Sequence, residues 1–178
     1  MVKIPKERIG VLIGEEGTTK EMIESKSGAE LEIDSQTGMV DVDTRGVNDP
    51  ILGMKVDDVV KAIGRGFSPR KAVKILKEDY YFELLDIKSY VGKSSKSVRR
   101  MKARLIGTNG RTRELIEELS GAFVSVYGKT VGIIGRNYEM DTARRAVEMI
   151  LSGAEHKTVY SFLEGSRREL KRKKGDWY

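Results

Sequence analysis

A glycine-containing turn followed by arginines is the most chemically suggestive segment of the chain. It covers residues 107–113, with glycines at its first and fourth positions and arginines at its fifth and seventh. Because glycine has no Cβ, a phosphate can approach the backbone of such a turn closely. The N–H groups and the dipole at the start of a following helix then attract the anion. The segment therefore predicts a phosphate-binding turn, of the kind that holds a nucleic-acid backbone.

A run of cations without a single carboxylate leads into this turn. The seven basic residues between Ile87 and Gly107 are Lys88, Lys93, Lys96, Arg99, Arg100, Lys102 and Arg104. At helical spacing, one stripe of this segment is apolar and the opposite stripe is basic (Lys96, Arg100 and Arg104). We expect the basic stripe to extend the nucleic-acid contact. The alternative is a solvated polar face, which describes most basic helix faces.

The sequence offers little to an enzyme. Its 178 residues include no cysteine and one histidine, His156, to which we assign no chemistry. Thiolate zinc sites, cysteine nucleophiles and multi-histidine metal sites are therefore excluded. We expect no catalytic residue, no metal and no cofactor. The sequence has neither an apolar run of about 18 residues nor a secretory signal, so we expect a cytoplasmic protein without a membrane partner. Its charged fraction of 34% is typical of heat-adapted proteins.

The positive charge is confined to the second half of the chain. The whole chain has a formal net charge of +6. Residues 1–79 hold 13 basic and 15 acidic side chains, whereas residues 80–178 hold 20 basic and 12 acidic ones. A basic region of this kind favours an anionic partner, most often nucleic acid, although solubility alone could account for it.

The chain contains two copies of one unit. Residues 9–33 align with residues 102–126 without a gap, at an offset of 93. The matches include both glycines of each turn (Gly14 and Gly17 with Gly107 and Gly110) and the Ser-Gly-Ala at 27–29 with that at 120–122. Each copy is close to half of the chain.

Periodicity predicts the same order of elements in each unit. In the first, a strand at 2–4 and a brief helix to residue 13 precede the turn, Thr18 caps the next helix, and a hairpin and a helix at about 56–66 follow. In the second, we expect strands at 81–87, 122–127 and 130–134 and helices at 95–106, 111–120 and 138–151. Ser68-Pro69 begins a linker helix through residue 76, and a last helix covers about 156–173.

This order resembles a type I KH domain, in which a GxxG turn joins two helices. The resemblance rests on residues 2–17 and 105–110, each with a GxxG in matching frame. Three further segments narrow the resemblance to one family: the joining segments 65–72 and 80–87, and the glycine-rich 131–135. The chain resembles the paired-KH ribosome-assembly proteins, as an archaeal counterpart of the eukaryotic "partner of Nob" family.

The resemblance implies an α+β fold with two tandem type I KH domains. Each would have a three-stranded antiparallel sheet with helices on one face. We expect a divergent first KH domain at 1–67, a linker helix at 68–79, a basic RNA-binding second KH domain at 80–154, and a basic C-terminal helix and tail at 155–178. Whether the tail touches RNA is left open.

The resemblance also implies a function: binding of single-stranded small-subunit rRNA near its 3′ end during ribosome assembly, with rRNA processing as the context. A KH domain clamps about four nucleotides. The residues expected to bind RNA are Lys96, Arg99, Arg100, Arg104, Ile106, Gly107, Thr108, Asn109, Gly110, Arg111, Arg113 and Val124. At Arg113 and Lys20 the family usually has an apolar residue, so a conventional groove wall there is in doubt and Arg113 could instead reach a phosphate. The alternative function is that of an adaptor that docks a translation-initiation or rRNA-processing protein, with the KH units largely scaffold.

The first unit is expected to bind RNA weakly, because its turn carries Glu15 and Glu16. A carboxylate about 4 Å from a phosphate costs about 1 kcal/mol even in water. Its strand pair adds an acidic face, which we interpret as solvated rather than as a metal site. We therefore assign its Gly14, Gly17 and Lys20 to weak RNA binding or to a scaffold that docks proteins.

Overall fold

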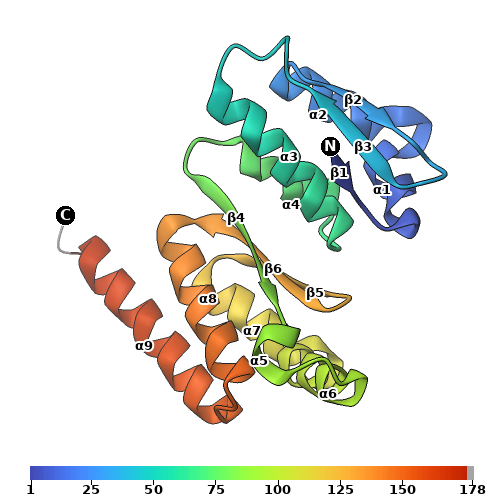
Figure 1. The fold of residues 1–178 in the computed structure, drawn as a ribbon. Helices are drawn as coiled ribbons and strands as arrows, with labels where there is room; N and C mark the ends of the chain where they lie inside the picture. The colour runs from blue at the N-terminus through green and yellow to red at the C-terminus, as the bar shows by residue number, and fades with distance from the viewer. Residues whose placement is uncertain (176–178) are drawn as a thin grey trace. The chain divides into compact units, whose positions relative to one another are not determined.

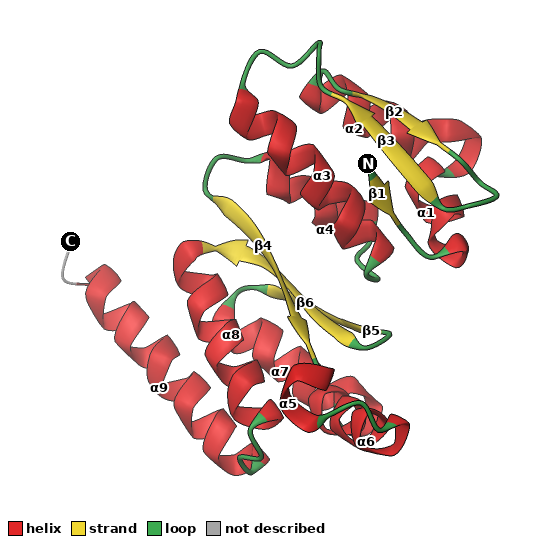
Figure 2. Ribbon diagram, in the orientation of Figure 1, coloured by secondary structure: helices red, strands yellow, loops and turns green. Residues whose placement is uncertain are grey.

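The computed structural model of the chain describes residues 1–175 and separates into two compact units (Figure 1). The first unit is Met1–Phe82, and the second begins at Glu83. Each unit combines helices with a three-stranded sheet, whose strand order is β1-β3-β2 in the first and β4-β6-β5 in the second (Figure 2). The predicted α+β class, with two antiparallel sheets and the type I KH order, is confirmed.

The first unit builds its sheet around β3. The edge strands β1 and β2 both pair with it antiparallel, with Val2 opposite Val40 and Leu31 opposite Val42. Its elements are β1 (Val2–Lys3), a 3-10 turn (Lys6–Arg8), α1 (Ile9–Ile13), the GxxG turn (Glu15–Gly17), α2 (Thr18–Ser27), β2 (Glu30–Ile33), β3 (Met39–Asp43), α3 (Pro50–Gly64), α4 (Pro69–Ala72) and a second 3-10 turn (Val73–Leu76).

Helix α3 begins six residues earlier than the predicted 56–66. Asp49 is its N-cap, and the side chain of Asp49 accepts a hydrogen bond from the N–H of Ile51 at 2.9 Å. Pro50 occupies the first helical position, where its missing N–H costs nothing. The apolar residues of this start do not belong to the buried stripe of the helix, since Ile51 and Met54 are exposed. The predicted inward residues further on, such as Val59 and Ile63, are fully buried.

The second unit repeats the plan with longer elements. Its parts are β4 (Tyr80–Asp86, whose first three residues end the first unit), α5 (Lys88–Val91), α6 (Ser95–Ile106), the 3-10 part of the GxxG turn (Thr108–Gly110), α7 (Arg111–Ser120), β5 (Phe123–Tyr127), β6 (Thr130–Arg136), α8 (Asn137–Leu151) and α9 (His156–Gly175). The limits of α6 and α7 agree with prediction. Residues 176–178 of the predicted C-terminal segment lie outside the described residues.

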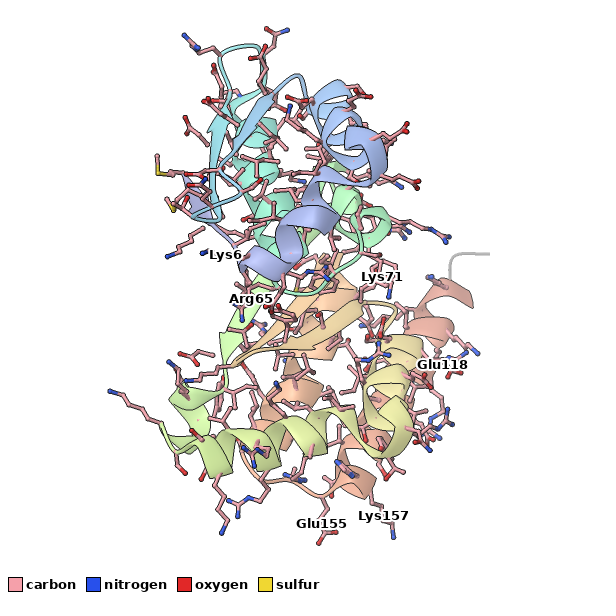
Figure 3. All side chains as sticks on the ribbon, turned by 90° about the vertical axis from the view of Figure 1, so that its right-hand side faces the viewer. Lys6, Arg65, Lys71, Glu118, Glu155 and Lys157 are labelled. Carbon is pink, nitrogen blue, oxygen red and sulfur yellow. The ribbon has the colours of Figure 1, made fainter. Side chains whose placement is uncertain are left out.

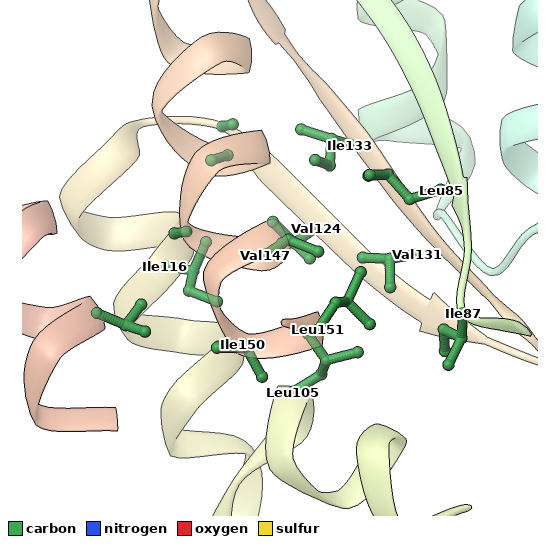
Figure 4. Packing of buried hydrophobic residues seen from close by; sticks show 14 of the residues in the cluster. Leu85, Ile87, Leu105, Ile116, Val124, Val131, Ile133, Val147, Ile150 and Leu151 are labelled. Atoms are coloured by element: carbon green, nitrogen blue, oxygen red, sulfur yellow. The ribbon is translucent and has the colours of Figure 1, made fainter. Parts of the chain in front are cut away.

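The core of the second unit lies between its sheet and its helices. Val124 on β5 and Ile133 on β6 are paired across the sheet and point into the same layer as Ile116 and Val147 (Figure 4). Helix α9 closes the layer by packing on α7 and α8, with Val159 and Leu163 fully buried. The core therefore fixes both α6 and α7, the two helices that the GxxG turn joins. Among residues 1–175, no helix is long and apolar enough to cross a membrane.

In each unit, an arginine binds carbonyls at and just beyond the end of the last helix of the KH fold, which is α3 or α8. In the first, the guanidinium of Arg8 donates to the carbonyls of Ile63 and Phe67, each at 2.8 Å. In the second, Arg104 donates to the carbonyl of Ile150 at 3.0 Å and to that of Ala154. The last carbonyls of a helix have no intrahelical partner. Those of Ile63 and Ile150 also accept from the N–H groups of Gly66 at 3.2 Å and Gly153 at 3.0 Å, so the guanidinium adds a charged donor to them.

We expect Arg104→Met to destabilise the second unit by about 2 kcal/mol, because it leaves two part-buried carbonyls without their charged donor. Urea unfolding followed by circular dichroism measures the change. Arg100→Met, on an exposed position of the same helix, is the matched control and should change the free energy of unfolding by less than about 0.5 kcal/mol. Equal stability of the two variants would contradict a structural role for Arg104.

Candidate nucleic-acid interface

The two GxxG turns have the same backbone conformation. Gly107 has φ 75° and ψ 175°, and Gly14 has φ 76° and ψ 171°. The third residue of each turn is left-handed without being glycine: φ is 54° at Asn109 and 52° at Glu16. The last glycine of each is left-handed as well. The two copies of the repeat therefore share the backbone conformation of the turn, and they differ in the side chains that the turn presents.

The first glycine of each turn is required by a threonine in the helix that follows. A Cβ on Gly107 would lie 2.2 Å from Oγ1 of Thr112, and one on Gly14 would lie 2.4 Å from Oγ1 of Thr19. Thr112 is buried, with its hydroxyl 2.9 Å from that of Tyr160 on α9. The threonine thus packs directly under the turn and holds it against the helix.

The last glycine of the second turn faces open space. Around Gly110, the nearest atom that an added Cβ would meet is the Arg113 guanidinium, at 4.0 Å. Gly110 is also the N-cap of α7, and it has no side chain to accept from the N–H groups of the first turn. The start of α7 therefore has no side-chain cap, and of its N–H groups that of Arg111 donates to the carbonyl of Thr108. A helix start without a side-chain cap is an arrangement that binds phosphate. The first unit shares this feature, so the predicted Thr18 cap is wrong: Thr18 lies inside α2, and Gly17 is the N-cap.

The predicted basic stripe divides into exposed cations and one internal cation. Lys96, Arg99 and Arg100 are exposed on α6, and no carboxylate of the described residues pairs with them. Arg104 is instead bonded to carbonyls at the end of α8. Beyond the turn, Arg111 is exposed. The free positive charge of this surface therefore comes from α6 and the first residue of α7.

Arg113 is held by its own helix. Its guanidinium pairs with the carboxylate of Glu117, one turn along α7. The equivalent Lys20 of the first unit pairs with Glu24 at 3.3 Å. The repeat thus preserves an ion pair at the position where the family usually has an apolar side chain. A phosphate contact by Arg113 would have to compete with Glu117.

The apolar residues expected to form a groove contribute unequally. Thr108 and Asn109 are exposed at the tip of the turn, and Ile106 beside it is half-buried. Val124 is only 4% exposed and belongs to the core, as does Leu105. A base beside this turn would therefore contact Ile106, whereas Val124 on β5 is too buried to offer it a surface.

The first unit presents carboxylates where the second presents cations. Glu15 and Glu16 are exposed in its turn, and Glu30, Glu32 and Asp41 are exposed on its strands. Hydrogen bonds from the side chain and backbone of Arg45 hold the pKa of Asp43 at about 2. Asp43 is therefore ionised at any physiological pH. Among residues 1–175, no group of three or more acidic or histidine side chains is arranged to hold a metal ion.

Sequence reasoning missed the residues behind the second turn. Nε2 of His156 lies 2.9 Å from the carbonyl oxygen of Arg104, and its ring stacks on Tyr160 with centroids 5.9 Å apart. Tyr160 in turn contacts Thr112. These residues are 44 or more positions from the turn along the chain, so no local pattern pointed to them.

Comparison with known proteins supports the KH order. Residues 81–168 match a family model of the second Pno1 KH domain, described as "Eukaryotic type KH-domain (KH-domain type I)". KH domain-containing protein MJ0443 of Methanocaldococcus jannaschii is 46% identical over 172 residues, which are 97% of this chain and 75% of that protein.

Two crystal structures from Pyrococcus horikoshii are also similar. Dim2p superposes with a TM-score of 0.84 at 46% identity, covering 92% of this chain and 96% of Dim2p. Dim2p in a complex with a/eIF2alpha and rRNA gives a TM-score of 0.87 at 44% identity, covering 94% of this chain and 93% of that one. The chain therefore belongs to the archaeal Dim2p family of paired KH-domain proteins, the homologues of Pno1.

Proposed function

We propose that the chain is a non-catalytic RNA-binding protein of small-subunit assembly, which holds single-stranded rRNA near its 3′ end mainly through the second unit. The observation that carries the proposal is the pairing of an open, uncapped GxxG turn with exposed, unpaired cations on α6 and at Arg111. The similar Dim2p was crystallised with rRNA, which supports the same class of ligand here.

The two KH domains have different roles in the proposed function. Residues 80–154 bind the strand, residues 1–67 serve as scaffold or as a protein-docking surface, and segments 68–79 and 155–178 link and extend them. The carboxylates of Glu15 and Glu16 stand at the tip of the first turn, where a phosphate would have to approach. Their repulsion offsets the attraction of an otherwise equivalent backbone.

A second candidate function is that of a protein adaptor. The complex of the similar Dim2p contains a/eIF2alpha as well as rRNA. The acidic strand face of the first unit is a surface of a different chemistry from the basic one of the second. A translation-initiation protein docked on the first unit is compatible with RNA held by the second.

We expect Gly110→Asp to lower affinity for single-stranded RNA by at least 10-fold. The substitution places a carboxylate at the uncapped start of α7, where it repels the phosphate and occupies the N–H groups. An added Cβ meets open space there, but φ is 76°, a left-handed conformation that strains most side chains and that Asp and Asn tolerate best. Gly110→Asn carries the same backbone strain without the charge. Fluorescence anisotropy with a labelled oligonucleotide from the 3′ end of archaeal small-subunit rRNA measures the effect, and thermal unfolding verifies folding.

Two controls accompany this variant. Gly110→Asn adds a side chain of similar size without charge and should lose less affinity than Gly110→Asp. Gly17→Asp makes the same change in the first unit and should lose less than 3-fold. If Gly17→Asp and Gly110→Asp weaken binding equally, the division of labour is wrong. If the unaltered protein fails to bind the oligonucleotide, the adaptor function replaces RNA binding.

We expect Lys96→Glu/Arg100→Glu to weaken RNA binding and to flatten its salt dependence. Each phosphate contact on a single strand contributes about 0.7 to the slope of log K against log salt, so losing two lowers the slope by about 1.4. Arg104 is left intact because its bonds to α8 would confound the result. Lys61→Glu/Arg70→Glu, at exposed positions of the first unit, makes the same change of charge and should leave the slope unaltered.

A further inference from the structure

A hollow beside the second GxxG turn brings residues of α9 next to residues that were predicted to bind RNA. It measures about 430 Å³ and lies among α6, the turn and the start of α9, and its lining includes Arg100, Arg104, Thr108, Arg111, His156 and Tyr160. This volume is within the range of small-ligand sites, about 300–1,000 Å³. The predicted groove residues Ile106 and Val124 do not line the hollow, whereas five other residues predicted to bind RNA do: Arg100, Arg104, Gly107, Thr108 and Arg111.

The lining combines positive charge with aromatic surface. The side chains of Arg100 and Arg111 are exposed, and no acidic residue lines the hollow. The rings of His156 and Tyr160 lie nearly parallel, at 17° to each other, and both are half-buried. Guanidinium groups suit a phosphate, and aromatic rings suit the face of a nucleobase. A nucleotide unit is the ligand class that requires both within one small site.

The aromatic pair is fixed before any ligand arrives. The His156 ring is tied to the carbonyl of Arg104, and the Tyr160 hydroxyl is tied to Thr112 under the turn. The neighbours of His156 behave differently, since Glu155 and Lys157 are exposed and point away from the ribbon (Figure 3). A ring that is held in place loses little conformational entropy when a base stacks on it.

The hollow is continuous with the phosphate-binding turn. Gly107 and Thr108 of the turn, and Arg111 and Thr112 of α7, all line it. A strand whose phosphates lie at the start of α7 would therefore have its next nucleotide within reach of the hollow. Base and phosphate would enter from the turn, without a change in the course of the strand.

The first unit lacks this chemistry at the corresponding positions. At the repeat offset of 93, Arg104, Thr108 and Arg111 correspond to Val11, Glu15 and Thr18. Counted from the carbonyls that Arg8 and Arg104 bind, His156 and Tyr160 correspond to Pro69 and Val73. The aromatic pair and the arginines are therefore additions to the shared fold, made only in the unit whose turn is free of carboxylates.

We propose that this hollow is a subsite for one further nucleotide of the bound strand, beyond the four that a KH groove holds. The proposal rests on the RNA binding proposed above. The Arg100 and Arg111 side chains would hold the phosphate, and the His156–Tyr160 pair would stack on the base. The subsite lengthens the stretch of RNA that the second unit recognises and makes α9 a part of the binding surface.

Extension of a short RNA tests the subsite. The probes are a tetranucleotide from the 3′ end of archaeal small-subunit rRNA, and the same tetranucleotide extended by two nucleotides on its 5′ side or on its 3′ side. One extension should raise affinity by about 5- to 150-fold, the range for stacking one base on an aromatic ring. Tyr160→Leu should abolish that gain. Its tetranucleotide affinity should stay within about 2-fold of that of Tyr160→Phe, which likewise loses the hydroxyl that contacts Thr112.

Two further variants separate stacking from structure. Tyr160→Phe keeps the ring and should keep most of the gain. Tyr138→Leu removes another tyrosine of this unit, whose hydroxyl donates to the Ser166 carbonyl of α9 at 3.2 Å, and should keep the whole gain. Thermal unfolding checks that each variant is folded.

A measurement on the unaltered protein guards against misfolding of Tyr160→Leu. His156 is the only histidine of the chain, so its ring proton signals are identified in a nuclear magnetic resonance spectrum without assignment of the rest. The extended RNA that gains affinity should shift these signals further than the tetranucleotide does. Tetranucleotide binding with no gain from either extension, or a gain that survives Tyr160→Leu, would overturn the subsite alone. Failure of all three RNAs to bind would overturn the proposed function together with the subsite.

Discussion

The contact between a glycine and a threonine sets the shape of the candidate interface. Thr112 occupies the space where a Cβ of residue 107 would be, and Thr19 does the same for residue 14. This packing fixes the first glycine against the helix, whereas an added Cβ on the last glycine would meet no close neighbour. The end of the turn proposed to bind phosphate, at Gly110, is thus the end that does not pack against the threonine.

The two units show that one backbone geometry can carry opposite electrostatics. Their turns agree in φ and ψ to within a few degrees, yet Glu15 and Glu16 in the first correspond to Thr108 and Asn109 in the second. The turn is held by its glycines and by the packed threonine, so its second residue can vary, and its third can vary among residues that tolerate the left-handed conformation. Charge at the tip can then change without cost to the fold, which is how a repeated unit acquires a different partner.

The sequence was sufficient to predict the elements that local patterns of residues determine. The limits of α6 and α7 follow from amphipathic spacing and glycine breaks, and the repeat fixed the order of the elements. The start of α3 was missed because its apolar residues Ile51 and Met54 are exposed and do not continue the buried stripe of the helix. Arg104 was misplaced among the surface cations because its partners lie 46 and 50 residues away. The role of His156 was hidden for the same reason, since spacing along the chain does not report contacts that only the folded helices create.

The arginines that close α3 and α8 bear on how variants of such duplicated proteins are interpreted. In the gapless alignment of the units, Arg8 corresponds to Met101 and Arg104 corresponds to Val11. Each arginine thus appears unmatched in its sister copy. Each nevertheless binds one carbonyl in the last turn of the equivalent helix and a second carbonyl four residues later, beyond the helix end. Both units thus have a guanidinium donor at this helix end, but a residue at a different position of the repeat supplies it in each unit. A score based on column identity would therefore rank these two positions as tolerant, when each supports the helix behind its GxxG turn.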